Sequence, residues 1–368
     1  MANNNENKVL NVPHLRFPEF TEEWVNVSLK DVADFQKERI SSGLLDESTY
    51  ISTENILQNF QGVQSAISIP ANTNVVAYKK NDILLSNIRP YLKKVWFSDR
   101  IGGCSADVFV LRSKTCEPEF LYNVIASDKF INYVMSGAKG VKMPRGDKNQ
   151  MESFSFSIPA VVEQRKISRL FQLLDERIVT QNKIIEKLQS LIKGITILLT
   201  AKGKPNTTIA QCLECHSSTL QESEVSHSGL YKVFGANGLV GYTDMPQMNG
   251  DAILIIKDGS GVGTTSYAQG EFSVIGTLNY LTAISNYDLR YLYFVLSVFN
   301  FQSYKTGMAI PHIYFKDYGN AKIFCPPLSE QKRIANVLGK LESKLCLEQN
   351  ILASFNLQKR YLLGQMFI

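Results

Sequence analysis

Two short motifs in this sequence contain residue types that could do chemistry. The run Cys212-Leu213-Glu214-Cys215-His216 has the spacing of a haem-attachment motif, but no second axial ligand is evident. Its two thiols and imidazole, together with His227, could instead hold zinc, although a tetrahedral site normally needs a second closely spaced pair. We therefore expect packed free thiols here, with zinc as the alternative.

The second motif is a glycine-rich run. Gly259-Ser260-Gly261-Val262-Gly263 resembles a phosphate-binding loop, yet it follows a strand-like run and opens into TTSYAQG rather than into a helix. This context predicts a hairpin or a DNA-facing loop.

Signatures of catalysis are otherwise missing from the sequence. The run Cys325-Pro326-Pro327-Leu328 lacks the Asn or Asp of the (N/D)PP(Y/F) motif of amino-methylating enzymes, and there is no GxxxxGK(S/T) loop. We expect a chain that is not an enzyme and has no catalytic residue, cofactor or metal of its own.

Basic residues interleaved with Asn, Tyr and Ser form a candidate DNA-binding stretch. DNA recognition requires cations for phosphates and bidentate side chains for base edges. Residues 79–100 contain six Lys or Arg against two Asp, although such a run can also be an ordinary solvated face. The candidates here are Lys79, Lys80, Ser86, Asn87, Arg89, Tyr91, Lys93 and Lys94.

Two loops of the form Gly-x-x-x-Pro provide the remaining candidates. GVKMP occupies residues 140–144 and GMAIP residues 307–311. A shared geometry for approaching DNA and a shared structural turn both explain the repetition. The candidates around these loops and the glycine-rich run are Lys142, Arg145, Lys257, Ser260, Thr264, Thr265, Lys305, His312, Tyr314 and Lys316.

The two loops belong to an internal repeat. The run EQRKI at residues 163–167 returns as EQKRI at residues 330–334, and both loops and a Pro before each run keep the same 167-residue shift. With small changes of register, FLYNVI (120–125) resembles YLYFVL (291–296), and NDILL (81–85) resembles GDAILI (250–255). The repeat unit is therefore a mixed domain followed by a helix.

Each helix has apolar residues at alternating three- and four-residue spacing. The first stripe is predicted at positions 167, 170, 174, 177, 181, 184, 188, 191, 195 and 198, with Arg177 and Gln181 as exceptions. The second runs from Ile334 to Met366 with Glu348 and Lys359 as exceptions. This spacing predicts two long helices that pack antiparallel as a coiled coil; the alternative is that each packs only on its own domain. Ser329 is predicted to cap the second helix, and Gly203 and Pro205 to end the first.

The predicted fold is mixed α/β. Two similar small α/β domains are separated by two long antiparallel coiled-coil helices, in a pseudo-twofold internal repeat. The predicted segments are an N-terminal segment (1–23), a first domain (24–160), a central helical spacer (161–204), a second domain (205–327) and a C-terminal helical spacer (328–368).

Composition is consistent with this organisation. Hydrophobic residues make up 44% and charged residues 20%, as in a soluble globular protein, and the net charge of +5 slightly favours a polyanionic partner. We expect a cytoplasmic protein, because neither a signal peptide nor a membrane span is apparent. The six cysteines are then expected to be free thiols.

Several motifs along the chain resemble those of a known family. PHLRFPEFTEEW (13–24), the following LKDVADF, YKVFGANGLVGY (231–242) with KDGSGVGTT (257–265), and the EQ(R/K)(K/R)I runs are similar to specificity subunits of Type I restriction-modification enzymes. The resemblance covers the whole chain, but it is weak inside the two recognition domains. One departure is that KLCLEQNILASF in the second helix slips by a residue against the first.

The resemblance implies a function and a set of partners. It implies a non-catalytic subunit of a DNA adenine-N6 methyltransferase and restriction endonuclease complex, which binds a bipartite asymmetric target in double-stranded DNA. Two methyltransferase subunits and the restriction or translocase subunits would bind through the helices. S-adenosylmethionine would belong to the methyltransferase, and ATP with Mg to the restriction subunit. Two alternatives remain, namely the DNA-binding half of a fused restriction-methylation enzyme and a coiled-coil scaffold.

Overall fold

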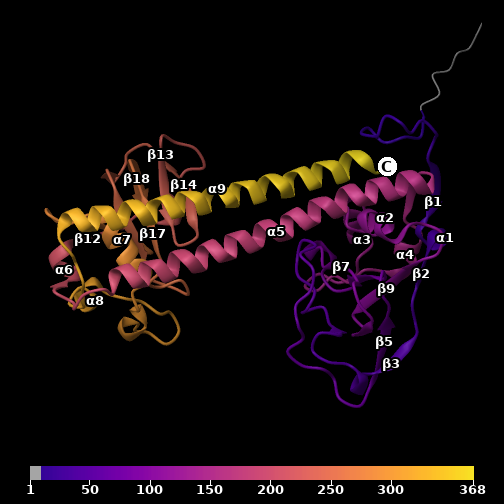
Figure 1. Ribbon diagram of the computed structural model, residues 1–368, viewed down its shortest axis with the longest axis horizontal. Helices are drawn as coiled ribbons and strands as arrows, with labels where there is room; N and C mark the ends of the chain where they lie inside the picture. The colour runs from indigo at the N-terminus through magenta and orange to yellow at the C-terminus, as the bar shows by residue number, and fades with distance from the viewer. Residues whose placement is uncertain (1–9) are drawn as a thin grey trace, which may run out of the picture. The chain divides into compact units, whose positions relative to one another are not determined.

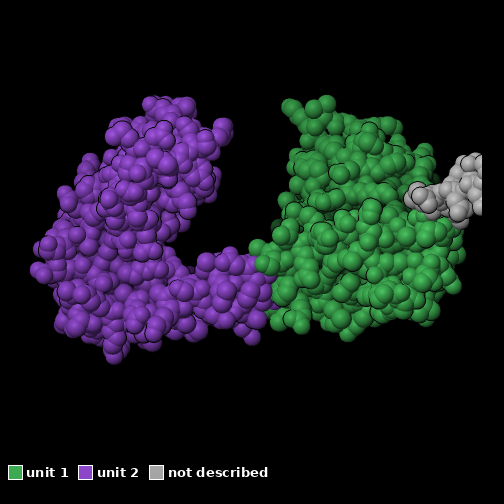
Figure 2. All heavy atoms as spheres, turned by 90° about the horizontal axis from the view of Figure 1, so that it is seen from above, with its two compact units in different colours: residues 1–180, 352–368 green, residues 181–351 purple. Residues whose placement is uncertain are grey.

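The computed structural model describes residues 10–368, so residues 1–9 of the predicted N-terminal segment lie outside the described residues. The chain divides into two compact units (Figure 2). Unit 1 consists of the chain up to Thr180 together with Leu352–Ile368, and unit 2 consists of Gln181–Ile351. Each unit is described by itself below.

Unit 1 is built on two four-stranded sheets. The first is antiparallel, in the order β2-β9-β6-β7, and its strands are β2 (Ala33–Phe35), β9 (Val108–Ser113), β6 (Ile83–Ser86) and β7 (Val95–Phe97). The second has the order β3-β5-β8-β4, with β3 (Arg39–Ser41), β5 (Asn74–Tyr78), β8 (Gly102–Cys104) and β4 (Tyr50–Ile51). A separate pair joins β1 (Val25–Ser28) to β10 (Ser155–Ile158).

Helices complete unit 1. The short ones are α1 (Leu29–Val32), η1 (Ser42–Leu44), η2 (Pro90–Leu92) and α4 (Lys148–Glu152). Longer helices α2 (Pro118–Ile125) and α3 (Asp128–Ser136) lie against the first half of α5 (Val161–Thr200) (Figure 1). Both have one apolar face, because Phe120, Val124, Phe130 and Val134 point into the core of the unit.

Unit 2 repeats the first sheet of unit 1. Its order β12-β19-β16-β17 comprises β12 (Leu213–Ser217), β19 (Leu278–Ala283), β16 (Ala252–Ile256) and β17 (Thr265–Ala268). The edge pair is β11 (Thr207–Thr208) with β20 (Lys322–Ile323). The helices are α6 (Ile209–Cys212), η3 (Glu222–Glu224), α7 (Leu289–Ser297), η4 (Phe301–Tyr304), α8 (Phe315–Tyr318) and the first part of α9 (Leu328–Met366).

The predicted repeat and fold class are confirmed. FLYNVI lies in α2 and YLYFVL in α7, while NDILL leads into β6 and GDAILI into β16. The LKDVADF segment forms α1 and β2, and IAQCLECH forms α6 and β12. Both short helices begin with a capping box, made by Ser28 with Asp31 and by Thr208 with Gln211. The division of the chain into five segments stays a prediction.

The second sheets differ between the units. In unit 2 the order is β14-β13-β18-β15, with β14 (Gly238–Thr243), β13 (Tyr231–Gly235), β18 (Glu271–Val274) and β15 (Met248–Asn249). The parallel neighbours there are β13 and β18, both inside the sheet, whereas in unit 1 the parallel strand β4 lies at the edge beside β8. This difference in strand order is a physical reason why the two copies of the repeat have little sequence similarity inside the domains.

The two long helices pack against each other and against their domains. In unit 1, Phe171 and Leu174 of α5 join a core that contains Leu363 and Met366 of α9 as well as residues of α2 and α3. In unit 2, Ile195 of α5 packs on a core that contains residues 334, 335 and 338 of α9. The start of α5 therefore packs beside the end of α9, and its end beside the start of α9, which makes the pair antiparallel. The helices therefore pack as the predicted antiparallel pair, and each also packs on a domain, as the alternative predicted.

The predicted stripe on α5 is partly wrong. The side chains at 167, 174, 181, 188 and 195 face inward, but the intervening positions after 170 are shifted by one residue. The helix buries or half-buries residues 171, 178, 185, 192 and 199, whereas the predicted positions 177, 184, 191 and 198 are exposed. The predicted Leu170 is half-buried and packs on the core of unit 1 beside Phe171. Arg177 is therefore exposed and does not interrupt the seam. Either choice gives a period of 3.5 residues, so periodicity alone could not distinguish them.

Polar residues in the seams have partners on the opposite helix. In unit 2, the Nε2 of Gln181 donates to the main-chain oxygen of Glu348 at 3.0 Å and also to its carboxylate. In unit 1, the ammonium group of Lys359 pairs with Asp175. The sequence exceptions Gln181, Glu348 and Lys359 are therefore buried, paired positions.

The repeated glutamines each hold two elements together. In unit 1, Gln164 donates to the Pro159 oxygen at 2.8 Å and accepts from the Glu117 amide, just before α2, at 2.9 Å. In unit 2, Gln331 donates to the Pro326 oxygen at 2.8 Å and accepts from the Asp288 amide, just before α7, at 2.9 Å. The EQ repeat is thus a structural joint. The helix α9 begins at Leu328, so the predicted cap Ser329 lies inside its first turn.

Candidate nucleic-acid interface

Most candidate residues of unit 1 lie on two loops that meet. One loop is the connection between β6 and β7, and the other contains GVKMP. The Arg89 amide donates to the Pro144 oxygen at 2.7 Å, and the Gly146 amide donates to the Asn87 oxygen at 3.0 Å. Lys139 and Arg145 exchange two main-chain hydrogen bonds, of 3.0 and 2.9 Å, that close the Gly-x-x-x-Pro loop.

Unit 2 has the same arrangement. The Gly259 amide donates to the Pro311 oxygen at 2.9 Å, and the Ile313 amide donates to the Lys257 oxygen at 3.0 Å. Thr306 and His312 exchange hydrogen bonds of 2.9 and 2.8 Å. The glycine-rich run is therefore the turn of the β16–β17 hairpin, and it corresponds to the basic stretch of unit 1. We call each pair of joined loops a loop platform, residues 87–94 with 139–146 in unit 1 and residues 257–264 with 306–313 in unit 2.

A left-handed backbone occurs at the same point in both platforms. Arg89 has φ of 51°, and Gly259, at the corresponding position, has φ of 95°. Glycine adopts this conformation without a steric penalty, whereas a residue with a Cβ is strained by about 1–2 kcal/mol. Strain of this kind persists mostly where a side chain has a function, so the geometry favours Arg89 as a contact residue.

The glycines that open the two Gly-x-x-x-Pro loops are needed there. Gly140 has φ of 97° and Gly307 φ of 86°. A Cβ at Gly140 would lie 3.2 Å from the Met143 oxygen, and one at Gly307 would overlap the Ile310 oxygen. The tight turn in each loop therefore depends on glycine.

Several predicted residues of unit 1 are already engaged. Lys93 forms an ion pair with Asp128, and Lys94 donates to the Thr53 oxygen at 2.6 Å. The prediction that Ser86 contacts DNA is wrong. Ser86 is buried, and its hydroxyl donates to the Ile88 oxygen at 3.0 Å.

Lys79 and Lys80 are not brought to the platform. They precede β6, whereas the platform loop follows it, so the length of the strand separates them from the loop. Lys79 instead pairs with Glu38 at 3.2 Å.

Exposed positive charge remains on the unit 1 platform. Arg89, Lys142 and Arg145 are exposed, and Tyr91 lies beside them on the β6–β7 connection. The guanidinium of Arg145 pairs with Asp107 at 2.7 Å, which holds it in one direction. An exposed surface pair of this type is weak and can exchange its partner for a phosphate.

Three predicted residues of unit 2 line one cavity. Lys257, Tyr314 and Lys316 surround a cavity of about 420 Å³ together with Ser217 and Asn279. The Lys316 ammonium lies 5.3 Å from the centre of the Tyr314 ring. Lys305, Ser260, Thr264 and Thr265 lie on the two platform loops or immediately beside them. The cavity thus combines two cations and the carboxylate of Asp258 with hydrogen-bonding side chains.

The Cys-x-x-Cys-His motif is part of the fold of unit 2. The Sγ atoms of Cys212 and Cys325 lie 3.9 Å apart, and this hydrogen bond lowers the pKa of the Cys212 thiol. His216 stacks on Tyr280, and burial raises the pKa of Cys215 to about 11. Among residues 10–368 no cluster of three or more His, Cys, Asp or Glu side chains could hold a metal ion.

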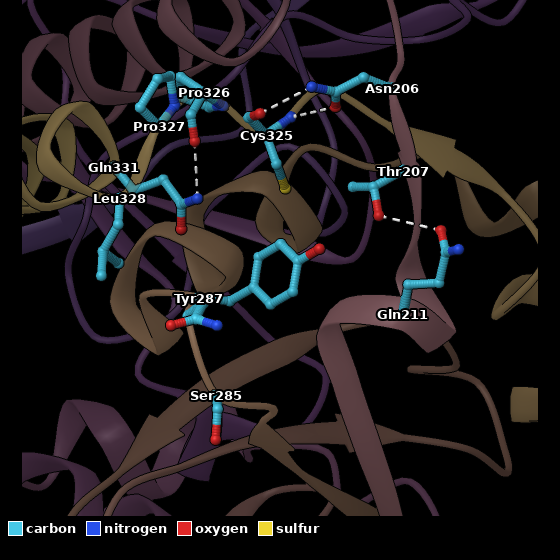
Figure 3. A pocket seen from close by; sticks show the side chains of 11 residues that line it. Asn206, Thr207, Gln211, Ser285, Tyr287, Cys325, Pro326, Pro327, Leu328 and Gln331 are labelled. Atoms are coloured by element: carbon cyan, nitrogen blue, oxygen red, sulfur yellow. Dashed lines mark hydrogen bonds between the residues drawn. The ribbon is translucent and has the colours of Figure 1, made fainter.

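A larger pocket of about 540 Å³ lies elsewhere in unit 2 (Figure 3). Its polar side chains are used by the chain itself, because Asn206 exchanges hydrogen bonds with the main chain of Cys325 and Gln331 donates to Pro326. The pocket therefore marks the joint at the start of α9.

Sequence reasoning missed two kinds of residue on or beside the platforms. Asn279 and Ser217 line the unit 2 cavity, but they come from β19 and β12, which nothing in the sequence connects with the loops. The apolar residues at the loop tips were also missed, namely Val141, Met143, Met308 and Ile310. Their signal was present in the sequence, because both copies place apolar residues between the Gly and the Pro.

Comparison with known proteins identifies the family. The model of the Type I restriction modification DNA specificity domain matches residues 21–190 and again residues 210–356. The two matches cover most of the chain and reproduce its internal repeat. The chain belongs to this family and contains two copies of its domain.

Individual relatives are distant in sequence. The chain is 23% identical over 198 residues to the EcoDI specificity subunit of Escherichia coli, and 27% identical over 194 residues to the MjaVIII specificity subunit of Methanocaldococcus jannaschii. These matches cover 53% and 51% of this chain and 44% of each relative. The matched part of this chain thus spans less than half the length of either relative.

Solved structures show the same fold. An S subunit of a Type I restriction-modification system from M. genitalium aligns over 97% of this chain and 99% of its own, with a TM-score of 0.67 and 17% identity. A chain from a structural study of complex assembly and conformational transition in the type I R-M system aligns over 96% and 98%, with a TM-score of 0.57 and 18% identity. Within the described residues, no helix is long and apolar enough to cross a membrane.

Proposed function

We propose that this chain is the DNA-specificity subunit of a Type I restriction-modification system. Each unit reads one half of a bipartite, asymmetric site in double-stranded DNA through its loop platform. The observation that carries this proposal is the repetition of the platform, with the same hydrogen bonds, in two units whose exposed side chains differ. Equal geometry with different side chains is what two readers of different sequences require.

The same proposal assigns the chemistry to other proteins. We infer that the chain is not itself an enzyme and binds no cofactor. Two methyltransferase subunits would use S-adenosylmethionine to modify adenine, and restriction subunits would use ATP and Mg. We place these partners on the long helices, because exposed apolar residues such as Leu173, Ile184 and Leu191 lie outside the α5 seam. This assignment and the proposed cytoplasmic location follow the family relationship.

The decisive experiment replaces one of the two DNA-recognition domains. The full chain is expressed with a Type I methyltransferase subunit that binds it, and modified adenines are mapped by sequencing. Replacing residues 24–158 with the corresponding domain of another family member is expected to change one half of the methylated motif and leave the other half unchanged. A change in both halves would contradict independent reading by the two units.

The alternatives predict different outcomes. A fused enzyme would methylate or cleave DNA without the separate methyltransferase. A scaffold would bind the methyltransferase yet leave its DNA specificity unchanged. The expected result is a ternary complex of the chain, methyltransferase and target DNA, with activity only when all three are present.

A further inference from the structure

The tips of both Gly-x-x-x-Pro loops expose apolar side chains. Val141 is 100% and Met143 48% exposed in unit 1, and Met308 is 105% and Ile310 65% exposed in unit 2. Single exposed apolar residues are ordinary in proteins. Here, however, the same two positions of the loop are apolar and exposed in both copies, although the residue types differ.

The loops hold these side chains on a firm base. Each tip is closed by two main-chain hydrogen bonds, between Lys139 and Arg145 or between Thr306 and His312. The Pro144 and Pro311 oxygens at the end of each loop accept from the neighbouring hairpin. A short loop braced on both sides can push side chains against a surface without folding back.

The surroundings of the tips identify the partner as a polyanion. Lys142 lies between the two apolar residues of the unit 1 tip, and Arg145 and Arg89 are exposed on the same platform. In unit 2 the platform adjoins a cavity lined by Lys257 and Lys316 together with one carboxylate, Asp258. Apolar side chains on platforms that also carry or adjoin cations suit a duplex, whose charged backbone encloses apolar base faces.

We propose that each loop tip is an apolar wedge that inserts between base pairs of its half-site and partly unstacks one step. Val141 and Met143 form the wedge of unit 1, and Met308 and Ile310 that of unit 2. The cations beside each tip hold the phosphates on either side of the opened step. Sequences that unstack easily would then be favoured at that step without any hydrogen bond to a base. This proposal rests on the proposed DNA-binding function.

The test uses the full chain in complex with its methyltransferase and a duplex that contains the methylated motif. The fluorescent base 2-aminopurine, which brightens when unstacked, replaces one base at a time in each half-site. The methylated adenine and its neighbouring steps are left out, because the methyltransferase itself extrudes that base. The variants are Val141→Ala with Met143→Ala, and Met308→Ala with Ile310→Ala. Ile67→Ala and Met245→Ala are the controls, because both residues are exposed apolar side chains outside the platforms.

The expected result is one bright step in each half-site with the parent complex. Each double variant should lose the signal in its own half-site only and bind the duplex roughly tenfold more weakly, because apolar contact is removed. Its salt dependence should be unchanged, because no charge is removed. The controls should behave like the parent.

Three results would contradict the proposal that the loop tips insert between base pairs. The first is a parent complex that binds its target specifically but shows no bright step. The second is a double variant that keeps the signal and affinity of the controls. The third is loss of the methyltransferase from the double variants, which would make the tips a protein contact. Failure of the parent complex to bind any specific duplex would instead refute the proposed function itself.

Discussion

At the scale of single residues, Arg89 is where stability and function should oppose each other. Its left-handed backbone is strained, and Gly259 relieves that strain at the same point of the other unit. Arg89→Gly is therefore expected to keep or raise the free energy of unfolding, by up to about 1 kcal/mol. The same change should relax one position of the methylated motif and cost about 1–3 kcal/mol in binding.

The Arg89 prediction is checked by thermal unfolding together with sequencing of modified adenines. Arg89→Lys serves as the control, because it keeps a charge and a Cβ but lacks the planar fork of the guanidinium. A variant that is less stable than the parent and keeps the parent motif would show that Arg89 has a structural role only.

Lysines on and near the platform separate into two kinds. Lys142 is exposed at the loop tip, whereas Lys93 is held by Asp128. Lys142→Ala should weaken binding to all DNA sequences and lower the slope of log affinity against log salt by about one. Lys93→Ala should change that slope less, because its charge is already paired. Equal slopes for the two variants would contradict this distinction.

From the sequence alone, the candidate DNA-binding residues could be predicted only by residue type and not by position on the surface. The charge excess predicted a basic stretch, but it could not show that Ser86 is buried or that Lys79 and Lys80 lie at the other end of a strand. Such facts depend on which backbone atoms pair across the sheet. The apolar residues of the loop tips can also be read from the sequence, but their residue types alone give no reason to expect that they are exposed.

At the scale of elements, the repeated glutamines are the joints between each domain and its long helix. Gln331→Leu removes the acceptor for the Asp288 amide and the donor for the Pro326 oxygen. Because Gln331 is buried, those groups would stay unsatisfied, and unfolding should become easier by about 1–3 kcal/mol. Chemical denaturation measures this loss.

Gln164→Leu should have a similar effect in unit 1, where the same bonds exist. Gln349→Leu is the matched control, because Gln349 is an exposed glutamine on the same helix as Gln331. Equal stability of Gln331→Leu and Gln349→Leu would show that the joint does not contribute to folding.

The seam of unit 2 should respond to acid through Glu348. Hydrogen bonds from Lys344 and then from Gln181 hold the pKa of this carboxyl below its usual range. A carboxyl with a lowered folded-state pKa contributes stability above its unfolded pKa of about 4.3 and loses it as the pH falls through the folded value. Glu348→Gln should therefore be less stable than the parent at pH 7, and the difference should vanish in acid.

Melting temperatures of the two proteins across a pH series test this dependence. Glu186→Gln is the control, since Glu186 is exposed on α5. A difference between parent and Glu348→Gln that persists unchanged at low pH would mean that packing, not charge, is responsible.

The element scale also shows what periodicity can predict. Helix lengths, the antiparallel pairing and the repeat followed from the spacing of apolar residues and from the EQ runs. The phase of the α5 stripe did not, because Ile184 and Ile185, or Leu191 and Ile192, are adjacent apolar residues. Ile185 is buried and Ile184 is exposed, so packing rather than the spacing of apolar residues decides which of the two faces inward.

At the scale of the whole molecule, both long helices run from one compact unit into the other. The helix α5 crosses the boundary at Thr180–Gln181, and α9 crosses it at Ile351–Leu352. The connection is therefore double, and any change in its length must be made in both helices. An insertion near the end of α5 alone would instead displace Leu199, which packs on the core of unit 2.

Matched insertions should change the spacing of the DNA target. Duplicating four residues of each helix at the unit boundary adds about one turn, or about 6 Å. At about 3.4 Å per base pair this corresponds to one or two base pairs. The four added residues also turn the helix by roughly 40°, comparable to the twist of about one base pair in B-DNA. The non-specific spacer between the half-sites should therefore lengthen by one or two base pairs, while both half-sites stay the same.

Mapping of modified adenines in cells that express the variant with its methyltransferase reads this spacer directly. The matched control carries the same four residues in α5 only, which puts the two helices out of register and should abolish methylation. If the doubly lengthened chain is folded and active but still methylates the original spacing, the helices do not set the distance between the half-sites. A lengthened spacer with altered half-sites would show instead that the insertion disturbs the platforms, whose hydrogen bonds all lie within their own units.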